Sequence, residues 1–331
     1  MPSCDFFSFR RCRTAAFLPI LLLLGCSDHP AAVTLKLAHG LDVSHPVHQG
    51  MVFLEAELAR LSDNTMALEI YPNQQLGTER QCLELLQIGS LAMTKVSGAV
   101  MENFAPDFQV LSLPYVFRDR DHLYRTLDSR TGRHLLLQGE RYRLRGLTYF
   151  DAGQRSFYAK EPIRTPEDLV GKKIRVQESV SAMQLVQALG ASPTPVSWGE
   201  LYTALQQGVV DGAENNLPSF HSSRHYELCR YYTLNEHTAV PDVLVIGTDA
   251  WSRLDPQQQA WLQAAADSAK VYQRRLWQAA EQASLAAVSA AGVEIIRPDK
   301  AAFAERTRPL LEAYRSHPTI YPLIRQIQEL P

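Results

Sequence analysis

Arg175 is a charged residue between two apolar neighbours, Ile174 and Val176. Alternation along a strand would turn its guanidinium away from both neighbours, and a charge that is buried needs a partner. The planar fork of a guanidinium matches the two oxygens of a carboxylate, so a carboxylate-bearing ligand is one candidate. A surface ion pair with Glu167 or Glu178 is the alternative that the sequence leaves open.

Other residue patterns could support metal or acid–base chemistry. His221 and His225 stand four residues apart, a spacing that can bind zinc from one helix face. No third ligand is evident, so we expect both to be surface groups and expect no bound metal. The sequence has no Gly-rich phosphate loop, Gly-x-Ser-x-Gly elbow or Cys-x-x-Cys pair. The rival class is an exported carbohydrate-active enzyme with Glu79 and Glu214 as its acid–base pair, but nothing in the sequence positions the two together.

The first 25 residues have the organisation of a secretory signal. A positive segment, Arg10-Arg11-Cys12-Arg13, precedes the apolar run 15–24, which is shorter than the roughly 20 residues that span a bilayer. The run ends in a glycine followed by Cys26, which resembles the lipobox of bacterial lipoproteins, whose cysteine is acylated. We expect a signal peptide over 1–25, a tether over 26–32 with lipidation at Cys26, and an extracytoplasmic protein. Ordinary cleavage that leaves a free thiol is the alternative.

Net charge and cysteine content further restrict the class of protein. Loss of the signal peptide removes three arginines and one aspartate, which takes the net charge from −2 to −4. The remaining chain has no basic block, so we expect no nucleic-acid partner. Only Cys26, Cys82 and Cys229 remain, which excludes a disulfide scaffold but leaves a Cys82–Cys229 bridge open. Roughly 300 residues usually form two domains.

Two series of strand and helix patterns follow the tether. In the first, alternating and amphipathic stretches predict strands and helices in turn, at 33–37, 53–61, 66–71, 78–88 and 92–96. In the second, from Arg145 onward, the corresponding stretches are 147–150, 173–176 and 180–189. Strand–helix–strand alternation with short links predicts α/β units with largely parallel sheets.

A long helix is predicted near the C-terminus. Asp255 is a good N-cap, Pro256 suits the first helical position and Gly292 suits the position after the C-cap. The stretch 257–291 between them contains no Gly or Pro, and as one helix it would run about 50 Å. We favour one helix over two helices broken near Ala279.

Several segments, in their order and spacing, resemble the solute-binding subunits of tripartite ATP-independent periplasmic (TRAP) transporters. The resemblance covers nearly all of the chain after the leader. The segments are Tyr-Pro-Asn-Gln-Gln-Leu-Gly-Thr-Glu-Arg (71–80), Leu-Pro-Tyr-Val-Phe (113–117), Arg-Ser-Phe-Tyr (155–158), Pro-Glu-Asp-Leu-Val-Gly-Lys-Lys-Ile-Arg-Val (166–176), Leu-Gly-Ala-Ser-Pro-Thr-Pro (189–195) and Tyr-Thr-Ala-Leu-Gln-Gln-Gly-Val-Val-Asp-Gly-Ala-Glu-Asn (202–215).

The resemblance implies an α/β, two-lobed periplasmic-binding-protein fold with hinge strands and a long bridging helix. The expected lobes are 33–152 plus 241–278 and 153–240 plus 279–331. Such a receptor closes on a small organic acid and delivers it to membrane permease subunits. It is expected to be a monomer that is not an enzyme and needs no cofactor. A sensor subunit that reports ligand occupancy to a receptor kinase would have the same fold.

The resemblance also implies a binding site. Family members hold the ligand carboxylate through the arginine at position 175, with further contacts from Arg155 and Asn215. Other expected lining residues lie in segments that the family uses for its cleft: His45, Glu79, Lys95, Ser97, Trp198, Asn216 and His237.

The ligand class is also implied by the resemblance. The stretches 94–97, 197–202 and 214–216 look most like members that bind sugar acids such as glucuronate or galacturonate. A C4-dicarboxylate is the alternative ligand. The Glu214-Asn215 pair differs from the pattern of members that hold oxo-acids through a metal ion.

Overall fold

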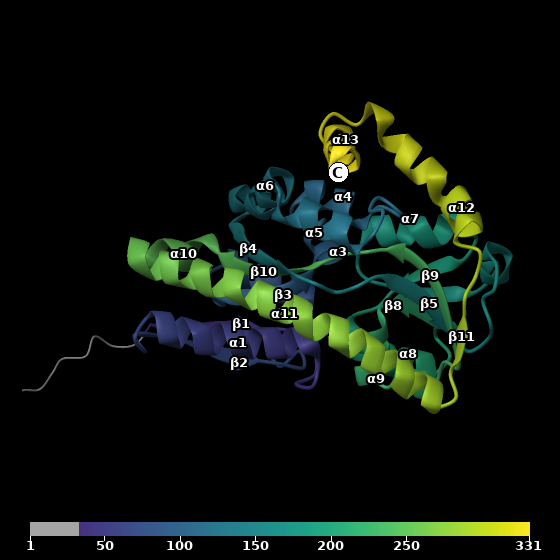
Figure 1. Ribbon diagram of the computed structural model, residues 1–331, viewed down its shortest axis with the longest axis horizontal. Coiled ribbons are helices and arrows are strands. Elements are labelled where there is room, and N and C mark those ends of the chain that lie inside the picture. The colour runs from purple at the N-terminus through teal and green to yellow at the C-terminus, as the bar shows by residue number, and fades with distance from the viewer. Residues whose placement is uncertain (1–32) are drawn as a thin grey trace, which may run out of the picture. The chain divides into compact units, whose positions relative to one another are not determined.

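The computed structural model describes residues 33–331, and its strands form one sheet of five strands and one of six (Figure 1). The predicted signal peptide, the tether and the lipidation site at Cys26 lie outside the described residues. Cys82 and Cys229 are both buried and free, so the bridge that the sequence left open is not formed. No described helix has the length and apolar character needed to cross a membrane.

The first sheet has the strand order β2-β1-β3-β10-β4. β1 pairs in parallel with β2 and β3, whereas β10 is antiparallel to both of its neighbours, β3 and β4. β10 therefore lies inside the first sheet although it follows five of the six strands of the second sheet in the chain, and all six of its residues are buried. The strands are β1 (Val33–Ala38), β2 (Met66–Tyr71), β3 (Met93–Ser97), β4 (Leu144–Phe150) and β10 (Asp242–Gly247).

Helices cover both faces of this sheet, as the strand–helix alternation predicted. One apolar core includes Leu54 of α1, and the other includes Leu86 of α2 and Leu135 of α6. The helices of this part are α1 (Pro46–Leu61), α2 (Glu79–Gln87), α3 (Gly98–Met101), α4 (Gln109–Ser112), α5 (Arg120–Asp128), α6 (Arg130–Gln138) and α10 (Thr248–Arg253).

The second sheet has the strand order β11-β9-β5-β8-β6-β7. β6 pairs in parallel with β7 and β8, and β5 is antiparallel to β8 and β9. Its strands are β5 (Arg155–Ala159), β6 (Lys173–Val176), β7 (Ser192–Pro195), β8 (Gly212–Asn215), β9 (Tyr231–Thr238) and β11 (Glu294–Ile296). Its helices are α7 (Val180–Ala188), α8 (Leu201–Gln206), α9 (Leu217–Ser222) and α12 (Lys300–Ala313).

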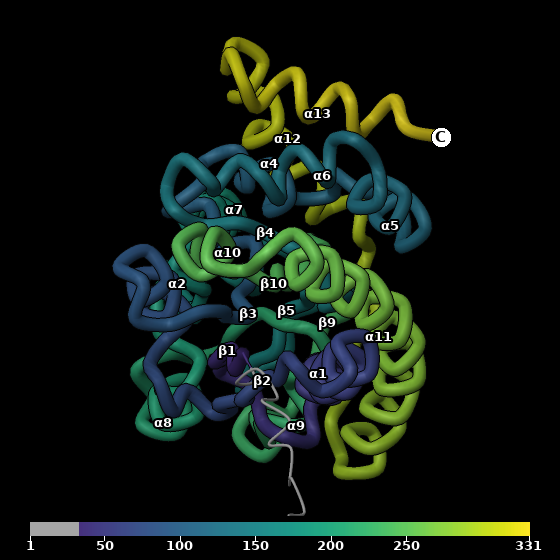
Figure 2. The backbone as a smooth tube through the Cα atoms, turned by 90° about the vertical axis from the view of Figure 1, so that its left-hand side faces the viewer, coloured from purple at the N-terminus to yellow at the C-terminus, as the bar shows by residue number. Residues whose placement is uncertain are grey.

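Two short chain segments and one long helix connect the two sheets. The segments are 151–154, between β4 and β5, and 239–241, between β9 and β10. The helix is α11 (Pro256–Ala290), which packs near its start into the core with α1 and near its end into the core with β9 (Figures 1 and 2). It is a single helix of 35 residues, which confirms the prediction of one unbroken element.

Its ends are those that the sequence predicted. The side chain of Asp255 accepts hydrogen bonds from the backbone N–H groups of Gln257 and Gln258, and Gln258 completes a capping box. Gly292 follows the C-cap with φ +87°, a conformation that glycine adopts without strain.

α11 is fixed against the first lobe close to one of the crossing segments. A Cβ atom on Gly50 of α1 would lie only 2.8 Å from Cγ of Gln273 on α11, so the two helices require a glycine there. Gln273 also hydrogen-bonds both the backbone N–H and the carbonyl of Asp151, each at 2.8 Å. The long helix is thereby tied directly to the segment that leads from the first sheet to the second.

The C-terminal helix α13 (Ile320–Glu329) departs from the expected lobe division. Its apolar residues, among them Leu323 and Ile327, belong to the core that contains α5 and α6 of the first lobe. Figures 1 and 2 both show it beside those helices. Placing all of 279–331 in the second lobe was therefore wrong for this helix, whereas the rest of the division stays a proposal.

Candidate functional site

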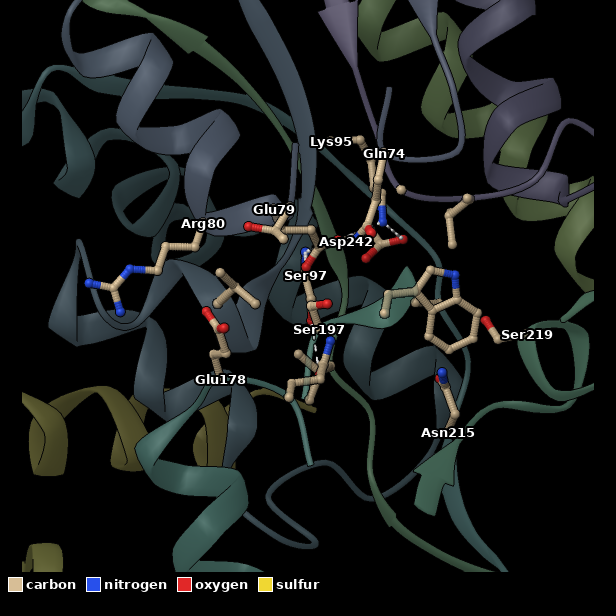
Figure 3. A pocket seen from close by; sticks show the side chains of 18 of the residues that line it. Gln74, Glu79, Arg80, Lys95, Ser97, Glu178, Ser197, Asn215, Ser219 and Asp242 are labelled. Carbon is tan, nitrogen blue, oxygen red and sulfur yellow. Dashed lines mark hydrogen bonds and ion pairs between the residues drawn. The ribbon is translucent and has the colours of Figure 1, made fainter. Parts of the chain in front are cut away.

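A cavity lies where loops and strand ends of the two sheets meet (Figure 3). Its walls come from the loop before α1, the start of α2, and the ends of β3, β5, β6, β8 and β10. Nine of the ten residues that we expected around a ligand line it: His45, Glu79, Lys95, Ser97, Arg155, Arg175, Trp198, Asn215 and Asn216. Their role in ligand binding stays a prediction.

Arg175 is enclosed but has no ionic partner. Its side chain is buried, Nε donates to the carbonyl of Val196 at 2.8 Å, and Nη1 has no hydrogen-bond partner. The ion pairs among the described residues do not include it, so neither Glu167 nor Glu178 neutralises it as the alternative required. Burial lowers the pKa of Arg175, as expected for a desolvated cation. A guanidinium that stays unpaired in a cavity wall is suited to receive an anion.

Arg155, in contrast, is saturated by its neighbours. β5 and β8 are adjacent and antiparallel, which brings Arg155 against Glu214 and Asn215. Nε donates to Oε2 of Glu214 at 2.5 Å, Nη2 to Oε1 at 2.8 Å, and Nη1 to Oδ1 of Asn215 at 3.0 Å. Burial alone would raise the pKa of Glu214, but Arg155 and then His237 more than offset it and hold this pKa at about 2. The charge of Arg155 is therefore balanced within the protein.

His237 does not line the cavity, contrary to our expectation. It is fully buried behind the Arg155–Glu214 pair, with Nε2 3.4 Å from Oε2 of Glu214 and its ring stacked on Phe157. Because β9 pairs with β5 on the side away from β8, the side chain supports the ion pair instead of facing a ligand.

A second charged cluster lies on the wall formed by the first sheet. Nζ of Lys95 is 3.0 Å from Oε1 of Glu79 and 3.2 Å from Oδ2 of Asp242. Burial alone would lower the pKa of Lys95, but Asp242 and then Glu79 raise it, so the lysine stays protonated. Glu79 also accepts from the backbone N–H of Ser97 at 3.2 Å. We call Glu79, Lys95 and Asp242 the acidic trio, because it contains two carboxylates and one ammonium group.

Polar contacts connect the two walls across the cavity. Nε2 of His45 is 3.2 Å from Oγ of Ser219, and Oγ of Ser97 donates to Oε1 of Gln177 at 3.3 Å. Asn216 uses its oxygen to cap α9, accepting from the N–H of Ser219 at 2.8 Å, which leaves its amide N–H groups for other partners. Sequence reasoning missed several lining residues, namely Gln74, Gln177, Ser219 and Asp242.

The histidine pair that we expected at the surface is placed differently. His225 is buried, and its Nδ1 lies 2.8 Å from the hydroxyl of Tyr158. It follows α9 in a short 3-10 turn and packs against Trp198, so the helical spacing with His221 that suggested two surface groups does not apply. Within 33–331, no group of three or more His, Cys, Asp or Glu side chains is arranged to hold a metal ion.

Two α/β lobes, a helix that bridges them and a cavity between them with an unpaired arginine define a solute-binding receptor. The chain belongs to the family of bacterial extracellular solute-binding proteins, family 7, which matches residues 37–317, and it is the solute-binding protein of a TRAP transporter. This confirms the fold and the function that the sequence predicted. The family is a class of extracytoplasmic receptors and not an enzyme class.

Similar proteins match along almost the whole chain. The protein YiiZ of Salmonella typhimurium is 37% identical over 95% of this chain and 96% of its own length. A TRAP solute-binding protein of Bradyrhizobium in complex with galacturonate has a TM-score of 0.88 and 37% identity, covering 90% of this chain and 100% of its own. A TRAP protein of Pseudomonas putida with bound D-glucuronate has a TM-score of 0.87 and 33% identity, covering 90% and 97%.

Proposed function

We propose that this receptor captures a hexuronate, such as galacturonate or glucuronate, and delivers it as a monomer to the membrane subunits of its transporter. The observation that carries the proposal is the guanidinium of Arg175 in the cavity wall, which has no ionic partner among the described residues and whose Nη1 has no hydrogen-bond partner. A uronate carboxylate would complete its hydrogen bonds and neutralise its charge, which offsets the cost of keeping an arginine buried.

The charge balance of the cavity favours one ligand carboxylate over two. Of the other cationic side chains that line it, Arg155 is paired with Glu214, and Lys95 with Glu79 and Asp242. Arg80 is exposed and paired with Glu84. A C4-dicarboxylate would need a second free cation, and this cavity offers none among its described residues.

The remaining lining suits a polyhydroxylated ring. The carboxylate oxygens of Glu79 can accept hydrogen bonds from hydroxyl groups, and the amides of Asn215 and Asn216 can donate as well as accept. The ring of Trp198 is a flat surface on which a sugar could pack, and its centre lies 6.0 Å from Cζ of Arg175. The uronates bound to the similar Bradyrhizobium and Pseudomonas proteins support the same ligand class.

A ligand panel tests this function. We expect galacturonate or glucuronate to raise the melting temperature of the mature protein and to make it more compact in X-ray scattering, since a ligand held by both lobes stabilises the closed state. At 100 times the dissociation constant the gain in unfolding free energy is about 2.7 kcal/mol. Succinate and a 2-oxo acid should do neither. Stabilisation by succinate alone, or binding of any ligand without compaction, contradicts the proposal.

We also propose that the signal peptide is removed before Cys26 and that this cysteine carries a lipid anchor. The motif at Cys26 supports this, although it lies outside the described residues. Cys26→Ala is then expected to release the protein from membranes and to abolish labelling by radioactive palmitate. Cys82→Ala is the matched control, because that thiol is buried in the fold, and its labelling should equal the wild type. A soluble, unlabelled wild-type protein would show that ordinary cleavage occurs instead.

A further inference from the structure

We propose that the acidic trio is a specificity filter, which accepts the hydroxyl-bearing end of a sugar acid and excludes a ligand with a second carboxylate at that end. The inference rests on the proposed function, because it takes Arg175 as the binding site of the first carboxylate. Asp242, which sequence reasoning did not find, is the residue that gives the trio its excess of negative charge.

The two sites lie on opposite walls of the cavity. Arg175 is part of β6 in the second sheet, whereas the trio comes from α2, β3 and β10 of the first lobe. A ligand that is anchored at Arg175 and clamped between the lobes therefore presents its far end to the trio. Figure 3 shows Glu79, Lys95 and Asp242 together on one side of the pocket.

The two carboxylates of the acidic trio are more exposed than its ammonium group. The side chain of Lys95 is only 3% exposed, whereas those of Glu79 and Asp242 are 17% and 10% exposed. The lysine is thus enclosed by its two counterions, and the ligand meets carboxylate oxygens. Such oxygens accept hydrogen bonds from sugar hydroxyls, but they have no proton to donate to another carboxylate.

The net charge of the acidic trio also disfavours a second ligand carboxylate. Two carboxylates face one ammonium group, and Arg155, which also acts on Asp242, is already neutralised by Glu214. Burial raises the pKa of Asp242, Lys95 opposes this effect, and Glu79 acts on it as a like charge. A second ligand carboxylate would be desolvated beside two like charges, and such juxtapositions reduce affinity by about 100-fold or more.

Two open-chain ligands isolate this effect. D-galactonate and D-galactarate differ only at one end, which is a hydroxymethyl group in the first and a carboxylate in the second. Calorimetry should give a dissociation constant at least about 100-fold lower for galactonate on the wild type, with galacturonate as the reference ligand.

Asp242→Asn keeps the shape of the side chain and leaves Lys95 paired with Glu79, and it should reduce this preference for galactonate by about 10-fold or more. The double variant E79Q/D242N frees the ammonium and should bind galactarate more tightly than the wild type does.

Glu178→Gln is the matched control. It removes one negative charge from the lining of the same cavity, but from outside the trio. We expect it to change the galactonate-to-galactarate ratio by less than about threefold. If Glu178→Gln relaxes the ratio as much as Asp242→Asn does, the general charge of the cavity decides selectivity and the filter is wrong.

The outcomes separate the filter from the proposed function. A wild type that binds galacturonate but binds galactarate as tightly as galactonate overturns the filter and leaves the function standing. A wild type that binds no uronate overturns the proposed function itself. Failure of both Asp242→Asn and E79Q/D242N to gain affinity for galactarate, with melting curves that show folded proteins, also overturns the filter.

Discussion

Arg175→Ala is expected to weaken uronate binding by roughly 2–5 kcal/mol, the range for removing one partner of a buried, hydrogen-bonded charge pair. The empty variant should nevertheless melt no lower than the wild type, because the substitution removes a buried cation that has no ionic partner. Titration calorimetry and thermal melts of the same preparations check both parts. Affinity within threefold of the wild type would show that the carboxylate binds elsewhere.

Two further arginine variants sharpen this test. Arg175→Lys keeps the charge but loses the planar fork, so we expect most of the affinity to be lost as well. Arg80→Ala is the matched control: Arg80 lines the same cavity, but its side chain is 56% exposed and paired with Glu84. Its removal should change the affinity by less than about threefold, as is usual for exposed ion pairs.

Acid is expected to destabilise the empty protein well above the pKa range of its carboxylates, because buried histidines, three of which have strongly lowered pKa values, must stay neutral in the fold. Burial, followed by Lys95, lowers the pKa of His39 to about 2 and that of His45 to about 3. Burial, followed by Arg175, lowers the pKa of His225 to about 3. Each pKa is lower in the fold than the 6.5 of an ordinary histidine, so the stabilisation is complete above pH 6.5 and is lost as the pH falls below it.

The size of this effect follows from linkage. At pH 5.5 each of the three histidines costs about 1.4 kcal/mol, so the unfolding free energy should fall by about 4 kcal/mol between pH 7.5 and 5.5. Urea unfolding at a series of pH values measures it. His225→Gln, which keeps a polar partner for Tyr158, should reduce the loss by about 1.4 kcal/mol. An equal loss in the His225→Gln variant would contradict the assignment.

Local signals made much of the fold predictable. α11 could be bounded to within one residue at each end because Asp255, Pro256 and Gly292 act through neighbouring backbone groups. The strands that carry Lys95 and Arg175 could be located because each combines apolar alternation with short links. Nine of the ten expected lining residues meet at one cavity, and they do so because the ends of strands from both sheets converge there.

The remaining features depend on contacts between segments that are far apart in the chain. Asp242 faces Lys95 only because β10 enters the first sheet between β3 and β4, a register that no local pattern of residues encodes. His225 is buried because a 3-10 turn replaces the helix that its spacing with His221 suggested. α13 belongs to the first lobe because its apolar face packs into the core that contains α5 and α6. Periodicity predicts such a face but does not tell which core it packs against.

The position of β10 also dictates the order in which the chain can complete its structure. Until residues 242–247 are available, β3 has an open edge and β4 has no partner strand, so the first sheet stays incomplete while five of the six strands of the second sheet are made. The sheet that begins the chain therefore stays open until β5 to β9 of the other sheet have been made, and its completion requires contacts of large sequence separation, which form slowly. Such late completion would suit the export that we propose for this protein, because it keeps the emerging chain from forming the native core of the first lobe before β10 has been made.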